Sequence, residues 1–158
     1  MNGLNHFLIP FNILFPVFHN SLPIVEIIIF SFLFGTLLDA ELIAGKFILK
    51  KPAHHLRTWV QEPLGVLFIG LPLALGLSIL KAEYLWLVLI PYTSHVMLDY
   101  LTIHEVCPLA PFSKKTKLLG IFRPSPAPSW CTSRFKGISE NYVTIISGII
   151  FIYLLYWF

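Results

Sequence analysis

The stretch PYTSHVMLDYLTIHEVCPLAP, residues 91–111, joins the end of an apolar run to a group of polar side chains. His95 and Asp99 are four residues apart, and Thr102 follows seven residues after His95. On an α-helix this spacing places the three side chains on one face, about one turn above each other. Because ionisable groups beside an apolar segment are costly without a partner, this face is suited to a metal ion or a proton relay.

The rest of the chain is apolar enough to predict a membrane protein. Of its 158 residues, 56% are hydrophobic and 12% are charged, whereas soluble domains carry roughly 25% charged residues. We therefore expect a single all-α domain, residues 1–158, built as a polytopic helical bundle in the membrane. We expect membrane lipids as its surroundings and no nucleic-acid partner, and the sequence leaves the oligomeric state open.

The apolar runs predict about five transmembrane helices. Four runs approach the ~20 residues that a spanning helix needs, and they are residues 22–38, 64–80, 84 to about 101, and 142–158. A shorter run, residues 4–18, contains Pro10 and Pro16. We interpret it as a further span that its prolines kink, with a re-entrant segment as the alternative.

The basic residues predict which end of the bundle faces the cytoplasm. Lysines and arginines concentrate in the loops before residue 64 and between residues 102 and 140, and Lys81 alone lies on the opposite side. The positive-inside rule then places both loops and the amino terminus in the cytoplasm. The second loop, residues 108–140, is proline-rich and basic, and it is interpreted either as a lid or as a flexible surface loop. We expect a multi-pass protein of the cell membrane with its polar site on the cytoplasmic side.

Ionisable residues collect at that same end. His6, Asp39, His95 and Asp99 lie within or beside apolar runs, where a functional role is the default interpretation. Asp39 and Glu41 are two residues apart, so on a continuous helix their side chains would diverge. They converge only if the helix ends or bends there, and a solvated helix end is an equally supported alternative.

Residues 50–63, KKPAHHLRTWVQEP, carry a second group of this kind. Pro52 can open a helix, on which His55 and Glu62 would share a face. Arg57 is suited to clamping an anion such as a phosphate. The alternative is that His54, His55 and the neighbouring basic residues bind lipid phosphates at the membrane surface.

Together these residues predict a metal site. The presence of imidazole favours Zn²⁺ first, with Mn²⁺ or Fe²⁺ as further options, over Mg²⁺. Cys107 and Cys131 fall in the predicted cytoplasmic loop, where a disulfide is not expected, and they lack the CxxC spacing of a zinc finger. The candidate ligands are His6, Asp39, Glu41, His54, His55, His95 and Asp99.

The pattern SHxxxDxxT at Ser94–Thr102, followed by Val106, Leu109 and Pro111, resembles a motif of a known family. The family is that of the YdjM-type predicted membrane-bound metal-dependent hydrolases, in which the block reads SHxxxDxxTxxGVPLLxP. The resemblance implies an integral membrane protein that uses a metal ion to hydrolyse its substrate.

Two earlier blocks are similar to the same family, and a third departs from it. LLDAE, ending in Glu41, looks like the family's LPDxD turn, and Asn5-His6 resembles its T-H pair. The family's HRGxTHS block is not reproduced, and residues 54–63 stand in its place. There, His54 or His55 is the candidate for the first imidazole, and Glu62 stands where the second histidine would be.

We therefore expect hydrolysis of a phosphoester or lipid-like substrate at the cytoplasmic membrane face. In this scheme Glu62 or Glu41 acts as the general base and Arg57 holds the phosphate. The alternative is a non-catalytic membrane protein, either an inactive relative with a structural metal or polar cluster, or a small transporter. A transporter is expected to carry ionisable groups through the midplane of the membrane, and the spans here carry few of them.

Overall fold

The computed structural model describes residues 3–39, 59–102, 105–106, 116–117, 121–123 and 138–157. Nearly all of these residues are helical, which confirms the all-α fold class. The helices are α1 (Gly3–Phe18), α2 (Ile24–Thr36), η1 (Leu37–Asp39), η3 (Trp59–Gln61), α4 (Pro63–Gly65), η4 (Val66–Gly70), α5 (Leu71–Ser78), α6 (Tyr84–Tyr100) and α7 (Glu140–Trp157). Two-residue strands form two small pairs, β1 (Glu105–Val106) with β2 (Thr116–Lys117) antiparallel, and β3 (Phe122–Arg123) with β4 (Ile138–Ser139) parallel.

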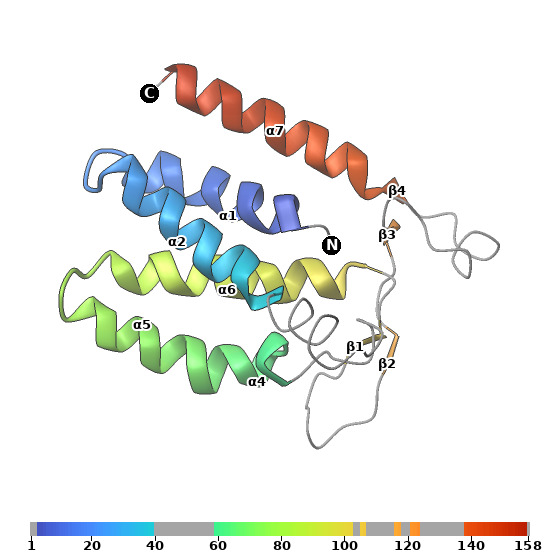
Figure 1. The fold of residues 1–158 in the computed structure, drawn as a ribbon, viewed down its shortest axis with the longest axis horizontal. Helices are drawn as coiled ribbons and strands as arrows, with labels where there is room; N and C mark the ends of the chain where they lie inside the picture. Colours follow the sequence, from blue (N-terminus) through green and yellow to red (C-terminus); the bar gives the residue numbers. More distant parts are fainter. Residues whose placement is uncertain are drawn as a thin grey trace.

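The helices lie side by side as one bundle (Figure 1). Helix α1 contacts α2, α6 and α7, and α6 also contacts α2 and α5. The turns that join α1 to α2 and α5 to α6 lie together at one end of the bundle, on the left in Figure 1. The amino terminus, η1, α4 and the start of α7 lie at the other end, so this second end gathers the segments that hold the predicted site residues.

The apolar core lies where α1, α2, α6 and α7 meet. Phe11, Leu14 and Ile27 are fully buried there. The ring of Phe11 stacks on that of Phe15 and packs against Phe151, with ring centroids 5.2 and 4.8 Å apart. Residues three and four apart share one face of a helix, so this spacing of aromatic residues lets one face of α1 pack into the core.

Much of the outer surface is also apolar. Large hydrophobic side chains are exposed on α1, α2, the α4–α5 rod, α6 and α7. Among the described residues, α7 is the one helix that is long and apolar enough to cross a membrane, and little of it is buried. Shorter apolar helices cover Gly3–Phe18, Ile24–Thr36 and Pro63–Ser78. The part of the chain that the structure describes thus holds one candidate spanning helix, and the multi-pass arrangement stays a prediction.

One predicted helix does not reach Glu62, and its residues 52–58 lie outside the described residues. We expected a helix opened by Pro52 to carry His55 and Glu62 on one face, but Glu62 is extended, with φ −122° and ψ 166°. The α-helix begins after it, at Pro63, because the proline ring disfavours helical geometry for the preceding residue. Glu62 therefore sits in a turn between η3 and α4, and His55 lies outside the described residues.

Candidate metal centre

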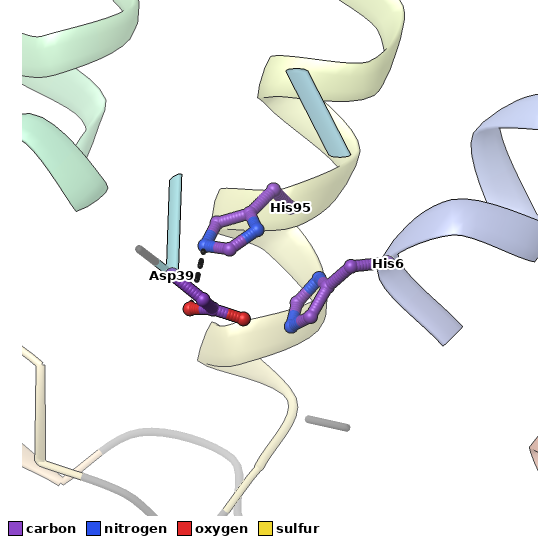
Figure 2. A group of neighbouring side chains, drawn as sticks. All are labelled: His6, Asp39 and His95. Atoms are coloured by element: carbon purple, nitrogen blue, oxygen red, sulfur yellow. Dashed lines mark ion pairs between the residues drawn. The ribbon is translucent and has the colours of Figure 1, made fainter. Parts of the chain in front are cut away.

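Three separate elements bring His6, Asp39 and His95 together. His6 belongs to α1, Asp39 ends η1, and His95 belongs to α6. Each offers one nitrogen or oxygen atom, and these atoms all lie within 4.8 Å of one another. In Figure 2 the Asp39 carboxylate and the two imidazole rings face a common space, and a dashed line joins Asp39 to His95. The α-helix ends before Asp39, since α2 ends at Thr36 and η1 follows. This is the helix end that convergence of Asp39 with Glu41 would need, and Glu41 lies outside the described residues.

Asp99 completes a cluster of four side chains. Its Oδ1 lies 3.3 Å from Nε2 of His6, and its Oδ2 lies 3.7 Å from Nε2 of His95. The two imidazole rings stack, with centroids 4.0 Å apart. We call His6, Asp39, His95 and Asp99 the His–Asp cluster. Both histidine side chains in it are fully buried.

The hydrogen bond of His95 fixes where its lone pair points. Nδ1 lies 2.7 Å from the carbonyl oxygen of Gly35, and a carbonyl can only accept, so Nδ1 carries the proton. Nε2 is buried and has no hydrogen-bond partner among the described residues. It faces oxygens of Asp39 and Asp99, at 3.6 and 3.7 Å. When Nδ1 carries the only ring proton, Nε2 of His95 is an acceptor, and the carboxylate oxygens of Asp39 and Asp99 are acceptors as well. Three buried acceptors that face one another need a proton or a cation between them.

A metal ion fits this arrangement. A histidine that binds a metal usually donates its other ring N–H to a carbonyl or carboxylate, as His95 does to Gly35. Ligand atoms of a tetrahedral site with bonds of about 2.1 Å lie roughly 3.4 Å apart. The 3.6 Å between His95 Nε2 and Asp39 Oδ1 is close to that separation. Two imidazoles with one or two carboxylates suit Zn²⁺, Fe²⁺ or Mn²⁺.

Gly35 allows α1 and α2 to approach at the cluster. A Cβ atom on Gly35 would lie 2.0 Å from the carbonyl oxygen of His6, which no side chain tolerates. Beside this contact, the hydroxyl of Thr36, the last residue of α2, donates to the carbonyl of Gly3, the first residue of α1, at 3.2 Å. Gly35 therefore brings His6 into range and also holds His95. In the sequence Gly35 stands four residues before Asp39, and nothing there indicates this role.

A turn formed by Val60, Gln61 and Glu62 lies against the same end of the bundle. The hydroxyl of Tyr92 donates to the carbonyl of Val60 at 2.7 Å, and that of Tyr100 donates to Oε2 of Glu62 at 2.7 Å. Between them, Nε2 of Gln61 donates to the carbonyl of Leu38 at 2.7 Å. We call residues 60–62 the anchored turn. Its contacts were not predictable from the sequence, because tyrosine and glutamine on apolar helices have many roles.

The remaining predicted site residues do not all join the cluster. Glu62 is buried and accepts a hydrogen bond from Tyr100, and it is not one of the three residues whose ligand atoms converge. The hydroxyl of Thr102 donates to the carbonyl of Asp99 within its own helix end at 2.7 Å. Glu41, His54, His55 and Arg57 lie outside the described residues, so their roles stay predictions.

Comparisons with protein-family models, with curated proteins and with solved structures found no match for this chain. The function of the His–Asp cluster is therefore inferred from its own chemistry.

Proposed function

We propose that this protein is a membrane-embedded, metal-dependent hydrolase whose divalent ion is bound by His6, Asp39 and His95. The observation that supports the proposal best is the buried Nε2 atom of His95. It faces two carboxylates while its partner nitrogen donates to Gly35. The resemblance of residues 94–102 to the YdjM-type hydrolases supports the same interpretation.

The multi-pass arrangement is supported by the apolar surface. Ile29, Phe32 and Phe68 are each about half exposed, at 46%, 51% and 63%, and they come from two different helical rods. Further large apolar side chains are exposed on each of these helices. Large exposed apolar patches are rare in soluble monomers and normally mark a surface that lipid or a partner covers. Helix α2 has 13 residues, about 20 Å of helix against a hydrocarbon core of about 30 Å. A bilayer accommodates such a short span by thinning around it.

The features of the two ends of the bundle support the proposed orientation in the membrane. The His–Asp cluster lies at the end that the positive-inside rule assigns to the cytoplasm. The exposed aromatic side chains of Tyr156 and Trp157 lie at the carboxyl end of α7, on the far side of the bundle. Aromatic residues of this kind gather at membrane–water interfaces. A substrate would therefore reach the cluster from the cytoplasmic leaflet.

The substrate class we propose is a phosphoester carried by a lipid. A bound divalent ion supplies a Lewis acid and makes water acidic enough to act as a nucleophile near neutral pH. Arg57 would hold the phosphate, as guanidinium groups do with paired hydrogen bonds. Glu62 would act as the general base, with its carboxylate held in one orientation by Tyr100.

The experiment uses the full-length protein purified in detergent. The protein is stripped with a chelator, and hydrolysis is followed on an aryl phosphodiester and on phosphatidic acid, before and after adding Zn²⁺, Mn²⁺ or Fe²⁺. We expect the activity to disappear on stripping, to return with one of these ions, and to stay absent in His95→Ala. Metal-free protein that retains full activity would overturn the proposal.

A second candidate is a non-catalytic membrane protein in which the ion only ties helices together. It is favoured by the contacts of Glu62 and Thr102, whose polar atoms take part in hydrogen bonds within the fold. This candidate predicts that metal is bound and that its removal lowers the unfolding temperature, but that neither substrate is hydrolysed under any metal condition. Metal binding, unfolding temperature and hydrolysis, measured on the same purified protein, therefore distinguish the two functions.

A further inference from the structure

We propose that Gln61 is a positioning residue for the metal site, because its side-chain amide holds the turn that delivers Asp39 to His95. This inference rests on the proposed metal site and extends it to a residue that is not itself a ligand. Gln61 is 1% exposed, and its Nε2 lies 2.7 Å from the carbonyl oxygen of Leu38. Leu38 is the residue immediately before Asp39.

The hydrogen bond acts on the peptide unit that leads into Asp39. The carbonyl of Leu38 and the nitrogen and Cα of Asp39 lie in one rigid plane. Holding that carbonyl oxygen therefore restrains the position of the Cα atom of Asp39, from which the side chain extends. Asp39 needs such support because it ends a three-residue 3₁₀ turn, and short 3₁₀ turns have weak hydrogen-bond geometry of their own.

Helix α6 carries His95 and also the two tyrosines that hold the anchored turn. His95 projects from α6 toward Asp39, with 3.6 Å between Nε2 and Oδ1. Tyr92 and Tyr100 on the same helix hold Val60 and Glu62, the residues on either side of Gln61. The anchored turn thus connects the segment that ends in Asp39 to α6, the helix that bears His95. A buried amide is costly unless it is hydrogen-bonded, so the bond of Gln61 to Leu38 is favoured over an arrangement that leaves this amide without a partner.

The test is a double-mutant cycle with Co²⁺ as the probe, in full-length protein purified in detergent and freed of metal. The four proteins are the parent, Gln61→Leu, Asp39→Ala and the double variant, each checked for parental helical circular dichroism. Gln61→Glu, which keeps the size but loses the donor, is measured alongside in case Gln61→Leu loses its helices. Asn12→Leu is the matched control, since Asn12 also donates a side-chain amide to a backbone carbonyl across two helices, at 2.9 Å from that of Ser147.

We expect Gln61→Leu to weaken Co²⁺ binding by about 10- to 100-fold, as loss of a residue that orients a ligand does. Its visible Co²⁺ spectrum should shift toward that of Asp39→Ala. In the Asp39→Ala background, Gln61→Leu should cause no further loss, because the ligand it positions is gone. Asn12→Leu should leave affinity and spectrum unchanged even if it lowers the unfolding temperature.

Two failures are distinguishable. If the parent binds Co²⁺ and the losses from Gln61→Leu and Asp39→Ala add in the double variant, Gln61 acts independently of Asp39. The positioning role is then overturned, while the metal site stands. If the parent binds no Co²⁺, the proposed metal site is overturned together with the role of Gln61.

Discussion

The carbonyl oxygen of Gly35 and the Nδ1 atom of His95 lie 2.7 Å apart, so a glycine on α2 sets the tautomer of a histidine on α6. The same glycine has the backbone of α1 against it, with no room for a Cβ atom beside the carbonyl of His6. One residue therefore links the two histidines of the cluster. This link makes the predicted metal site sensitive to changes that touch no ligand.

Gly35→Ala should disrupt the cluster. The new methyl group would meet the carbonyl oxygen of His6 at 2.0 Å, and forcing extra volume into a packed site costs about 1–3 kcal/mol or more. We expect a lower unfolding temperature and a loss of metal binding by equilibrium dialysis. Gly76→Ala is the control, because a Cβ atom there meets nothing within 4 Å. Parental metal binding in Gly35→Ala would show that the close approach of α1 and α2 is not required.

Glu62→Gln should lower the rate of hydrolysis without lowering the stability of the fold. The glutamine keeps an oxygen that accepts the hydrogen bond of Tyr100, so we expect near-parental stability. Loss of a general base lowers the rate by about 10²- to 10⁴-fold, measured as kcat on the substrate that the parent hydrolyses. Tyr100→Phe keeps the carboxylate and removes one donor to it, so it should cost about 1.5–3 kcal/mol of stability. An unchanged kcat in Glu62→Gln would exclude this residue as the base.

The pH dependence of stability should reveal an ion pair at the other end of the bundle. Nζ of Lys81 lies 3.1 and 3.2 Å from the two carboxylate oxygens of Glu26. The hydrogen bond to Glu26 is the main cause that raises the pKa of Lys81 above its usual 10.5. The stability this contributes is fully present below pH 10.5 and is lost as the pH rises through the raised pKa of the folded protein.

Lys81→Met removes this contribution, so the parent should be the more stable protein at neutral pH, by a small margin that salt reduces. The margin should shrink above the usual lysine pKa. The measurement is the thermal unfolding of both proteins from neutral pH to above pH 10.5, the usual lysine pKa. A margin that stays constant with pH would mean that the pair does not contribute through the charge of Lys81.

A charge on the outer face of α7 should report whether that helix lies in lipid. Ile149, near the middle of α7, is 62% exposed, so Ile149→Asp would cost little in water. At the centre of a membrane-spanning helix an aspartate costs about 2.5–3.5 kcal/mol. We expect a reduced membrane-inserted fraction, measured by resistance to alkaline extraction. Tyr156→Asp, near the helix end and 87% exposed, should have a much smaller effect. Equal insertion of Ile149→Asp and the parent would place α7 outside the bilayer.

The helices could be predicted because long apolar runs and short turns determine them. The run at residues 84–101 became α6, Tyr84–Tyr100, and the run at 64–80 became the rod from Pro63 to Ser78. The π-helical turn η4 inside that rod was not predicted. It lies where Gly70 packs against the ring of Tyr92, and such a contact depends on the register between two helices.

The site could be predicted in part for a similar reason. His6, Asp39 and His95 were identifiable because each is an ionisable residue beside an apolar run, where it needs a partner. The contributions of Gly35 and Gln61 were not identifiable. The carbonyl of Gly35 accepts a hydrogen bond from His95, and Gln61 donates one to the carbonyl of Leu38. Each contact depends on a backbone carbonyl, which leaves no pattern in the sequence.

X-ray absorption spectroscopy of the zinc-loaded protein can show whether two histidines and a carboxylate bind the ion. We expect a shell of nitrogen and oxygen atoms at about 2.0–2.1 Å, with the multiple scattering of two imidazole rings and no sulfur. One ring's contribution should disappear in His95→Ala. A sulfur shell at about 2.3 Å, as zinc bound to Cys107 or Cys131 would give, or a shell without imidazole scattering, would contradict this ligand set.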